Sequence, residues 1–107
     1  RTAPDAAQRL EVGSLELELE RMQAARRGEP LSLTPREIRL LERLMRTPDV
    51  VVSKQELLDD VWGEGFDGPT NVVEVYVGYL RRKIDSPYGV SSLRTVRGFG
   101  YVLHRVE

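Results

Sequence analysis

The chain has 107 residues, a formal net charge of −1, no cysteine and a single histidine, His104. This length, with 40 % hydrophobic residues, suits one domain with one core. Without cysteine, the sequence excludes thiolate catalysis, disulfides and Cys/His zinc clusters. No motif surrounds His104, and no close pair of nucleophile and base is evident. We therefore expect no enzyme, no cofactor and no metal site.

The N-terminal residues are polar and rich in alanine, and the chain begins with Arg1 rather than Met. We predict that residues 1–9 are the remnant of a linker and that residues 10–107 form the folded domain. The longest apolar run is much shorter than the roughly 20 residues that cross a bilayer. No secretion signal opens the sequence. We therefore expect a soluble cytoplasmic protein that does not contact a membrane.

The charge is unevenly distributed along the chain. Residues 1–69 contain 10 Lys/Arg and 14 Asp/Glu, whereas residues 70–107 contain 6 and 3. A local excess of positive charge can attract a polyanion even when the whole chain is slightly acidic. The run Arg81, Arg82, Lys83 is typical of a nucleic-acid contact, or of a solvated helix end that complements the helix dipole. Charge alone leaves both interpretations open.

The N-terminal third has the pattern of a small antiparallel sheet. Leucine and glutamate alternate over residues 15–20, which is the period of a strand with one buried face. Gly13 and Ser14 form a two-residue turn before it, and residues 27–29 mark a later turn. We predict up to four short strands over about residues 10–33. The glutamate row is then the exposed face of a strand, not a metal site.

Two capping boxes mark the starts of the first two helices. Thr34 and Ser53 are each followed, three residues later, by a glutamate. Pro35 follows Thr34 at the first helical position, which proline favours. These signals predict helices over about residues 35–46 and 54–61.

A third helix is predicted over about residues 70–84, after a loop at residues 63–69 that holds three glycines and a proline. At about 100° per residue, one apolar stripe faces the core, formed by Val73, Val77, Leu80 and Ile84. The opposite side carries Asn71, Val75, Gly78 and Arg82, with Tyr79 and Arg81 on its flanks. This outward side is rich in residues that can contact a partner.

Residues 93–103 are predicted to form a β-hairpin, with Gly98 and Gly100 fitting a tight tip around Phe99. A sheet, three helices and a hairpin, in that order, predict an α+β fold of the winged helix-turn-helix class. A fold does not fix a function, so sequence blocks within these elements must narrow it.

Four blocks of the sequence resemble the OmpR/PhoB-type effector domains of response regulators. They are residues 33–37, 61–63, 71–83 and 94–101, within a resemblance that covers about residues 10–104. The resemblance implies a winged-helix domain that binds specific double-stranded DNA. It further implies transcription regulation as the output domain of a bacterial two-component phosphorelay.

By resemblance, the third helix is the recognition helix and the hairpin is the wing. The DNA-binding residues implied are Trp62, Asn71, Val75, Gly78, Tyr79, Arg81, Arg82, Thr95, Arg97 and Tyr101. Arginine, asparagine and threonine side chains at these places can bind phosphate or line a groove. For Trp62 and Tyr101, packing into the body of the domain stays open beside a DNA contact.

Two positions of the third helix depart from many relatives, which have long basic side chains where Gly78 and Tyr79 stand. Tyr79 can stack on sugar, touch a thymine methyl or donate one hydrogen bond. It cannot make the bidentate guanine contact of an arginine. The sequence therefore leaves the target site undefined.

The resemblance also implies partners. Two copies are expected on a tandem-repeat site, as a homodimer on DNA with half-sites about one helical turn apart. The loop residues Glu64, Phe66 and Asp67 are expected to contact RNA polymerase. In a full-length protein, a receiver domain and a sensor histidine kinase are expected.

Two alternative functions stay open at this stage. The chain is alternatively a protein-interaction winged-helix module, or the DNA-binding domain of a membrane-anchored one-component regulator. A polyanion binder loses affinity steeply with salt, whereas a hydrophobic docking surface does not.

Overall fold

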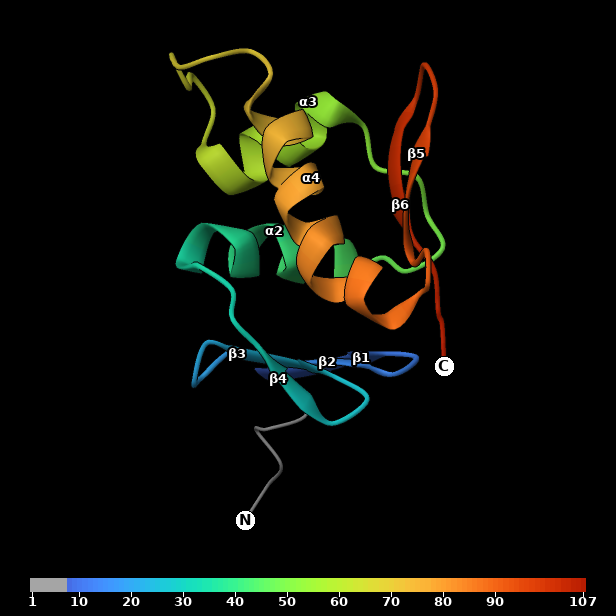
Figure 1. The fold of residues 1–107 in the computed structure, drawn as a ribbon. Helices are drawn as coiled ribbons and strands as arrows, with labels where there is room; N and C mark the ends of the chain where they lie inside the picture. The colour runs from blue at the N-terminus through green and yellow to red at the C-terminus, as the bar shows by residue number, and fades with distance from the viewer. Residues whose placement is uncertain (1–7) are drawn as a thin grey trace.

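Figure 1 shows the fold of the domain, taken from a computed structural model that describes residues 8–107. A four-stranded sheet lies on one side of the helices, and a separate two-stranded hairpin flanks α4, the helix formed by Val72–Ile84. The predicted linker, residues 1–9, lies mainly outside the described residues, and the first strand already begins at Arg9. No helix within residues 8–107 is long and apolar enough to span a membrane.

The N-terminal sheet has four antiparallel strands in sequential order, as predicted. The strands are β1 (Arg9–Val12), β2 (Leu15–Glu18), β3 (Gln23–Arg26) and β4 (Glu29–Leu31). Leu15 and Leu17 are buried, while Glu16 and Glu18 stay partly exposed on the other face. The alternation of leucine and glutamate therefore predicted the buried face. Strand β2 ends at Glu18, two residues earlier than the pattern suggested.

The turn between β1 and β2 requires its glycine. Gly13 has φ +62°, and a Cβ there would overlap the backbone of Val106. The next amide, that of Ser14, donates a hydrogen bond to the Val106 carbonyl over 2.8 Å. The turn thus anchors the C-terminal segment against the sheet.

The helices begin where the capping boxes predicted. They are α2 (Pro35–Met45), α3 (Lys54–Leu57) and α4 (Val72–Ile84), with a 3-10 turn η2 (Ser86–Tyr88) after α4. In the first box, the Thr34 amide donates to Glu37 Oε1 at 2.9 Å, and the Glu37 amide donates back to the Thr34 hydroxyl. Both boxes are complete in the structure, so these helix starts follow from local chemistry.

The second helix differs from its prediction. The α-helical part ends at Leu57, and a wider π-helical turn, η1 (Leu58–Trp62), completes it. The Gly63 amide closes this turn by donating to the carbonyl of Leu58, five residues earlier. A single turn with one extra residue changes the hydrophobic period too little to be recognised, so the sequence did not predict the π-helical turn. The widened turn ends on Trp62, beside α4.

The core joins the sheet, the helices and the hairpin. The inward stripe of α4 is buried as predicted, with Val73, Val77, Leu80 and Ile84 each at most 1 % exposed. Leu41 and Leu44 of α2 and Leu17 of β2 belong to the same cluster. Packing therefore fixes the rotation of α4 about its axis and leaves its opposite side outward.

The hairpin consists of β5 (Leu93–Val96) and β6 (Gly100–Leu103). It docks on the body through paired hydrogen bonds between Val52 and Tyr101, of 2.8 and 2.9 Å. A Cβ at Gly100 would overlap the Val52 carbonyl. Gly100 therefore permits close docking of the hairpin and does not shape its tip, contrary to the prediction. Gly98, with φ +79°, shapes the tip.

Candidate nucleic-acid interface

The outward side of α4 carries the residues that the helical periodicity placed there. Val75 and Tyr79 are 37 % and 39 % exposed, and Arg82 is exposed beside them. Asn71 stands at the N-cap, yet its side chain makes no capping hydrogen bond. These side chains are therefore available to a ligand along the length of the helix.

One flank of α4 is covered by three stacked rings, which we call the aromatic row: Trp62, Tyr76 and Tyr79. Adjacent rings pack edge to face, each pair with centroids 5.2 Å apart. Trp62 and Tyr76 are half-buried against the core, so one face of the tryptophan ring serves core packing. A guanidinium lies over each end of the row, that of Arg36 over Trp62 and that of Arg82 over Tyr79.

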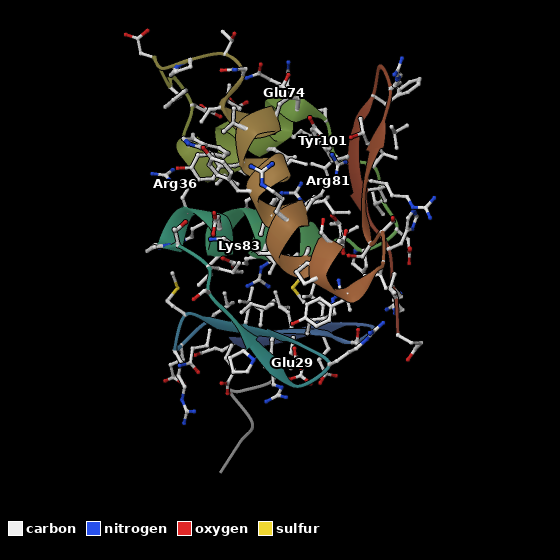
Figure 2. All side chains as sticks on the ribbon, in the orientation of Figure 1. Glu29, Arg36, Glu74, Arg81, Lys83 and Tyr101 are labelled. Atoms are coloured by element: carbon white, nitrogen blue, oxygen red, sulfur yellow. The ribbon has the colours of Figure 1, made fainter. Side chains whose placement is uncertain are left out.

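Arg81 connects α4 to the hairpin. Its Nε donates to the Leu93 carbonyl at 2.9 Å, and its Nη2 donates to the Thr95 hydroxyl at 2.6 Å. Figure 2 shows Arg81 on the side of α4 that faces the hairpin. Two of the predicted site residues are thus bound to each other. Arg81 holds the wing beside the helix, and within residues 8–107 its Nη1 has no hydrogen-bond partner.

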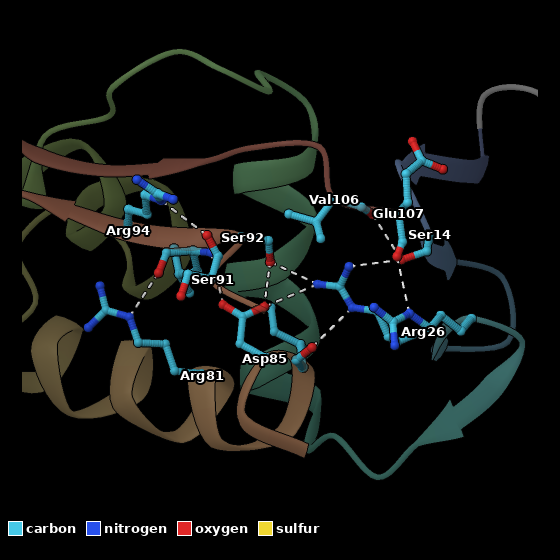
Figure 3. A network of polar contacts seen from close by, with 12 residues as sticks. Ser14, Arg26, Arg81, Asp85, Ser91, Ser92, Arg94, Val106 and Glu107 are labelled. Carbon is cyan, nitrogen blue, oxygen red and sulfur yellow. Dashed lines mark hydrogen bonds and ion pairs between the residues drawn. The ribbon is translucent and has the colours of Figure 1, made fainter. Parts of the chain in front are cut away.

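A second connection lies beneath this one and was not predicted (Figure 3). Arg26 of β3 is completely buried, and its Nε donates to the carbonyl of Ile84, the last residue of α4, at 3.0 Å. Its Nη2 donates to Asp85 Oδ1 and to the Ser92 hydroxyl, and its Nη1 donates to the Ser14 hydroxyl. Burial lowers the pKa of Arg26, and the charge of Asp85 opposes that shift.

Asp85 completes the connection on the hairpin side. Its Oδ2 accepts from the Leu93 amide at 3.0 Å, and its Oδ1 accepts from the Ser92 hydroxyl at 2.6 Å. One buried network therefore joins the sheet, the end of α4 and the base of β5. This network, with Arg81, sets the angle between α4 and the wing.

The wing presents exposed residues around its tip. Arg97 begins the turn between the strands and is exposed, as is Arg94 on β5. Phe99 is 72 % exposed at the tip, and it was not among the residues predicted to bind DNA. The sequence does contain a signal for this exposure, because an aromatic residue between two glycines of a hairpin tip lies far from the core.

Tyr101 lies differently from the other predicted wing residues. It is only 7 % exposed, and burial raises the pKa of its hydroxyl. Its ring belongs to the core cluster. The ring therefore packs in the core, which is one of the two positions that the sequence left open for this residue. Its outer edge borders a shallow groove with Lys54 and Glu74.

The arginines of α4 and the wing differ from most others in having no carboxylate partner. Within residues 8–107, ion pairs hold Arg9, Arg21, Arg26, Arg43, Arg46 and Arg105. In the same range no ion pair forms at Arg81, Arg82, Arg94 or Arg97. Lys83 is a different case, since it binds Glu37 at 2.8 Å and serves the packing of α4 on α2. Arg81 bonds Thr95 across the gap between helix and hairpin, whereas Arg94, the residue before Thr95 on β5, points to the other face of the hairpin.

The loop at residues 63–69 projects at the N-terminal end of α4, away from the sheet (Figure 1). Glu64 and Asp67 are exposed and form no ion pair within the part of the chain that the structure describes. Phe66 is half-buried because its ring lies over Gly68. The loop is thus an acidic surface separate from the unpaired arginines. No group of three metal-ligating side chains occurs in residues 8–107.

Residues 28–103 match the family described as "Transcriptional regulatory protein, C terminal". CseB of Streptomyces avermitilis is 45 % identical over 102 residues, which cover 95 % of this chain and 41 % of CseB. TcrA of Mycobacterium tuberculosis is 41 % identical over 96 residues, covering 90 % of this chain and 38 % of TcrA. The chain spans about two fifths of the length of these relatives.

Solved structures show the same fold. The DNA-binding domain of CpxR from E. coli superposes with a TM-score of 0.78 at 32 % identity, over 92 % of this chain and 98 % of that one. The RstA DNA-binding domain of Klebsiella pneumoniae, solved in complex with the RstA box, shares the fold with a TM-score of 0.79 at 24 % identity, covering 91 % and 97 %. These matches confirm the predicted α+β winged-helix class. They also confirm that the domain belongs to a family of DNA-binding domains rather than of enzymes. The chain belongs to the C-terminal domains of transcriptional regulatory proteins, the winged-helix DNA-binding domains of the OmpR/PhoB type.

Proposed function

We propose that this domain binds a specific duplex DNA sequence and regulates transcription as the output domain of a response regulator. The observation that carries the proposal is that the arginines of α4 and the wing have no carboxylate partner within residues 8–107, in a chain with more carboxylates than cations. The CpxR match supports it, because that structure is a DNA-binding domain with the same fold at 32 % identity. In this arrangement α4 enters the major groove and the wing contacts the adjacent backbone or minor groove.

The proposed contacts divide into those that position and those that specify. Asn71, Arg82, Arg97 and the free donors of Arg81 bind phosphate oxygens, and the Trp62 indole N–H donates to another. Val75 and Tyr79 face base edges, where a methyl contact and one hydrogen bond are available. Thr95 orients Arg81 and borders the backbone. Specificity then rests on few base contacts, because Gly78 provides no side chain.

The proposed assembly has two copies on a tandem repeat, with half-sites about one helical turn apart. Relatives of more than twice this length support a longer protein in which a receiver domain precedes this one, joined through the residues before β1. In such a protein a sensor histidine kinase supplies the signal, and the site of action is the cytoplasm.

The test is selection of bound oligonucleotides from a random pool, followed by titration of the selected and a scrambled duplex at several salt concentrations. We expect log K to fall linearly with log salt, with a slope of several units. A clear preference for the selected duplex is also expected. A slope near zero would instead favour a protein-interaction module.

For the loop at residues 63–69 we propose contact with RNA polymerase. Its acidic side chains lie apart from the unpaired arginines. Because they are negatively charged, DNA repels them and a basic protein surface attracts them. Replacing Glu64 and Asp67 together by alanine should change promoter output in a reconstituted transcription assay and leave DNA affinity near wild type. A large loss of DNA affinity in the double variant would contradict this assignment.

A further inference from the structure

Arg36 lies outside the helix-turn-helix and the wing, at the second position of α2. Its guanidinium carbon lies 5.5 Å from the centre of the Trp62 ring, and its Nη1 donates to the Val61 carbonyl at 2.7 Å. Figure 2 shows Arg36 on the side of α4 opposite the hairpin. It thus forms the far end of a line that continues through the aromatic row to Arg82.

The local structure of α2 does not account for a cation at this position. The N-terminal end of a helix carries partial positive charge, so the first turn favours acidic residues over arginine. Arg36 forms no ion pair within residues 8–107, although the chain has 17 carboxylates. Its side chain is nevertheless held in one place by the ring below it and by the Val61 carbonyl.

A guanidinium has five N–H donors in a planar fork, and the Val61 carbonyl uses Nη1 alone. The remaining donors belong to an exposed residue. Stacking on Trp62 restricts the rotamers before any ligand arrives, which lowers the entropy lost on binding. These are the properties of a pre-oriented anion contact.

We propose that Arg36 is a phosphate-binding residue that extends the DNA interface from α4 onto the start of α2. The inference rests on the proposed DNA binding. When α4 lies in the major groove, the backbone strand that borders it passes the aromatic row on the helix flank. Arg36, beyond Trp62, meets that strand on the side opposite the wing. The domain then grips the backbone on both sides of α4, through the wing arginines and through Arg36.

Arg39 provides the matched control. It lies on the same helix, is exposed, forms no ion pair within the described residues and borders the same shallow depression as Arg36. No contact between Arg39 and an aromatic ring is seen in the described chain. Arg36→Gln and Arg39→Gln each remove one charge. Glutamine at position 36 also keeps an N–H donor for the Val61 carbonyl.

Affinity of the wild type and both variants is measured on the selected and the scrambled duplex at four salt concentrations, after thermal melts have verified folding. Arg36→Gln should reduce the salt slope by about one unit and weaken both duplexes by a similar factor. Arg39→Gln should reduce the slope by less than half as much. Phosphate-ethylation interference on the selected duplex should lose one sensitive phosphate with Arg36→Gln.

An unchanged slope for Arg36→Gln, or equal changes for both variants, would overturn the inference while DNA binding by the wild type stands. Absence of wild-type binding to either duplex would overturn the proposed function and this inference with it.

Discussion

The N-terminal sheet and the α4–wing region both carry arginines, but they use them differently. On the sheet, Arg9 lies among three glutamates, at 3.3 to 3.9 Å, and Arg26 is paired in the core. On α4 and the wing, four arginines have no carboxylate partner within residues 8–107. Arg27, next to Arg26, also lacks an ion pair within these residues, so the contrast is one of degree: all four arginines of α4 and the wing are unpaired, and Arg9 and Arg26 of the sheet are paired.

The reason lies in where the few acids of the C-terminal region are used. Residues 70–107 contain three carboxylate side chains, and those of Glu74 and Asp85 are bound by cations from earlier in the chain. Lys54 holds Glu74 at 3.1 Å, and Arg26 holds Asp85 at 3.2 Å. Cations from the first 69 residues thus neutralise two of the three carboxylate side chains in the C-terminal region. Few acids therefore remain in this region beside its arginines.

The largest effect is expected from breaking the buried pair of the sheet. Arg26→Ala leaves Asp85, Ser92 and the Ile84 carbonyl without their buried partner. Removing one member of a buried ion pair costs about 3–5 kcal/mol. We expect a loss of that size in the free energy of unfolding, measured by urea denaturation.

Arg27→Ala is the control, because Arg27 is next to Arg26 in the sequence but is exposed, and within residues 8–107 its side chain contacts the Glu107 carbonyl and the face of Tyr88. It should cost about 1 kcal/mol or less. Equal losses for Arg26→Ala and Arg27→Ala would show that the buried network does not hold the sheet to α4.

Much of the fold could be predicted from local signals. Thr34 and Ser53 fixed two helix starts, and the inward stripe of α4 followed from its period. These signals act within a few residues, so a sequence displays them directly. The π-helical turn before Trp62 changes the period for one turn only, and no composition signal accompanies it.

The outward position of most candidate residues on α4 and the wing could be predicted, whereas the contacts between them could not. The alternation in β3 places Arg26 on the same face as Ala24, which signals an inward arginine. Its partner Asp85 lies 59 residues away in the sequence, so the pairing depends on tertiary structure. The same holds for Arg81 with Thr95 and for Arg36 with Trp62. Exposed side chains could be selected from a pattern, whereas the contacts that orient them could not.

A second prediction compares the removal of one arginine from each of the two regions. Arg97→Ala removes an exposed, unpaired cation from the wing, and Arg21→Ala removes an exposed cation beside the sheet. We expect Arg97→Ala to weaken binding of the selected and scrambled duplexes by similar factors, about tenfold to hundredfold, since a charge-assisted hydrogen bond contributes roughly 1.5–3 kcal/mol. Its salt slope should shrink by about one unit. Arg21→Ala should match the wild type in both measurements, and a similar loss for the two variants would remove the distinction between scaffold and interface.

The smallest effect is expected at Gly78 in the middle of α4. The four strands of the N-terminal sheet contain no glycine. Glycine in mid-helix costs about 1 kcal/mol relative to alanine. A Cβ at position 78 has no heavy atom within 4 Å outside its local helix, so neither packing nor strain explains the glycine. Close approach of the helix backbone to DNA would explain it.

On that hypothesis, Gly78→Ala raises the melting temperature, because the helix gains about 1 kcal/mol and meets no clash. The same methyl group stands between α4 and the groove, so affinity for the selected duplex falls. Tyr79→Phe is the companion variant: it removes one hydroxyl, and its loss should appear at particular base positions if Tyr79 contacts a base edge. The measurement pairs thermal melts with titrations of the selected and scrambled duplexes. A Gly78→Ala domain that is more stable and binds with full affinity would show that the groove leaves room for a methyl group, and that the glycine does not serve DNA binding.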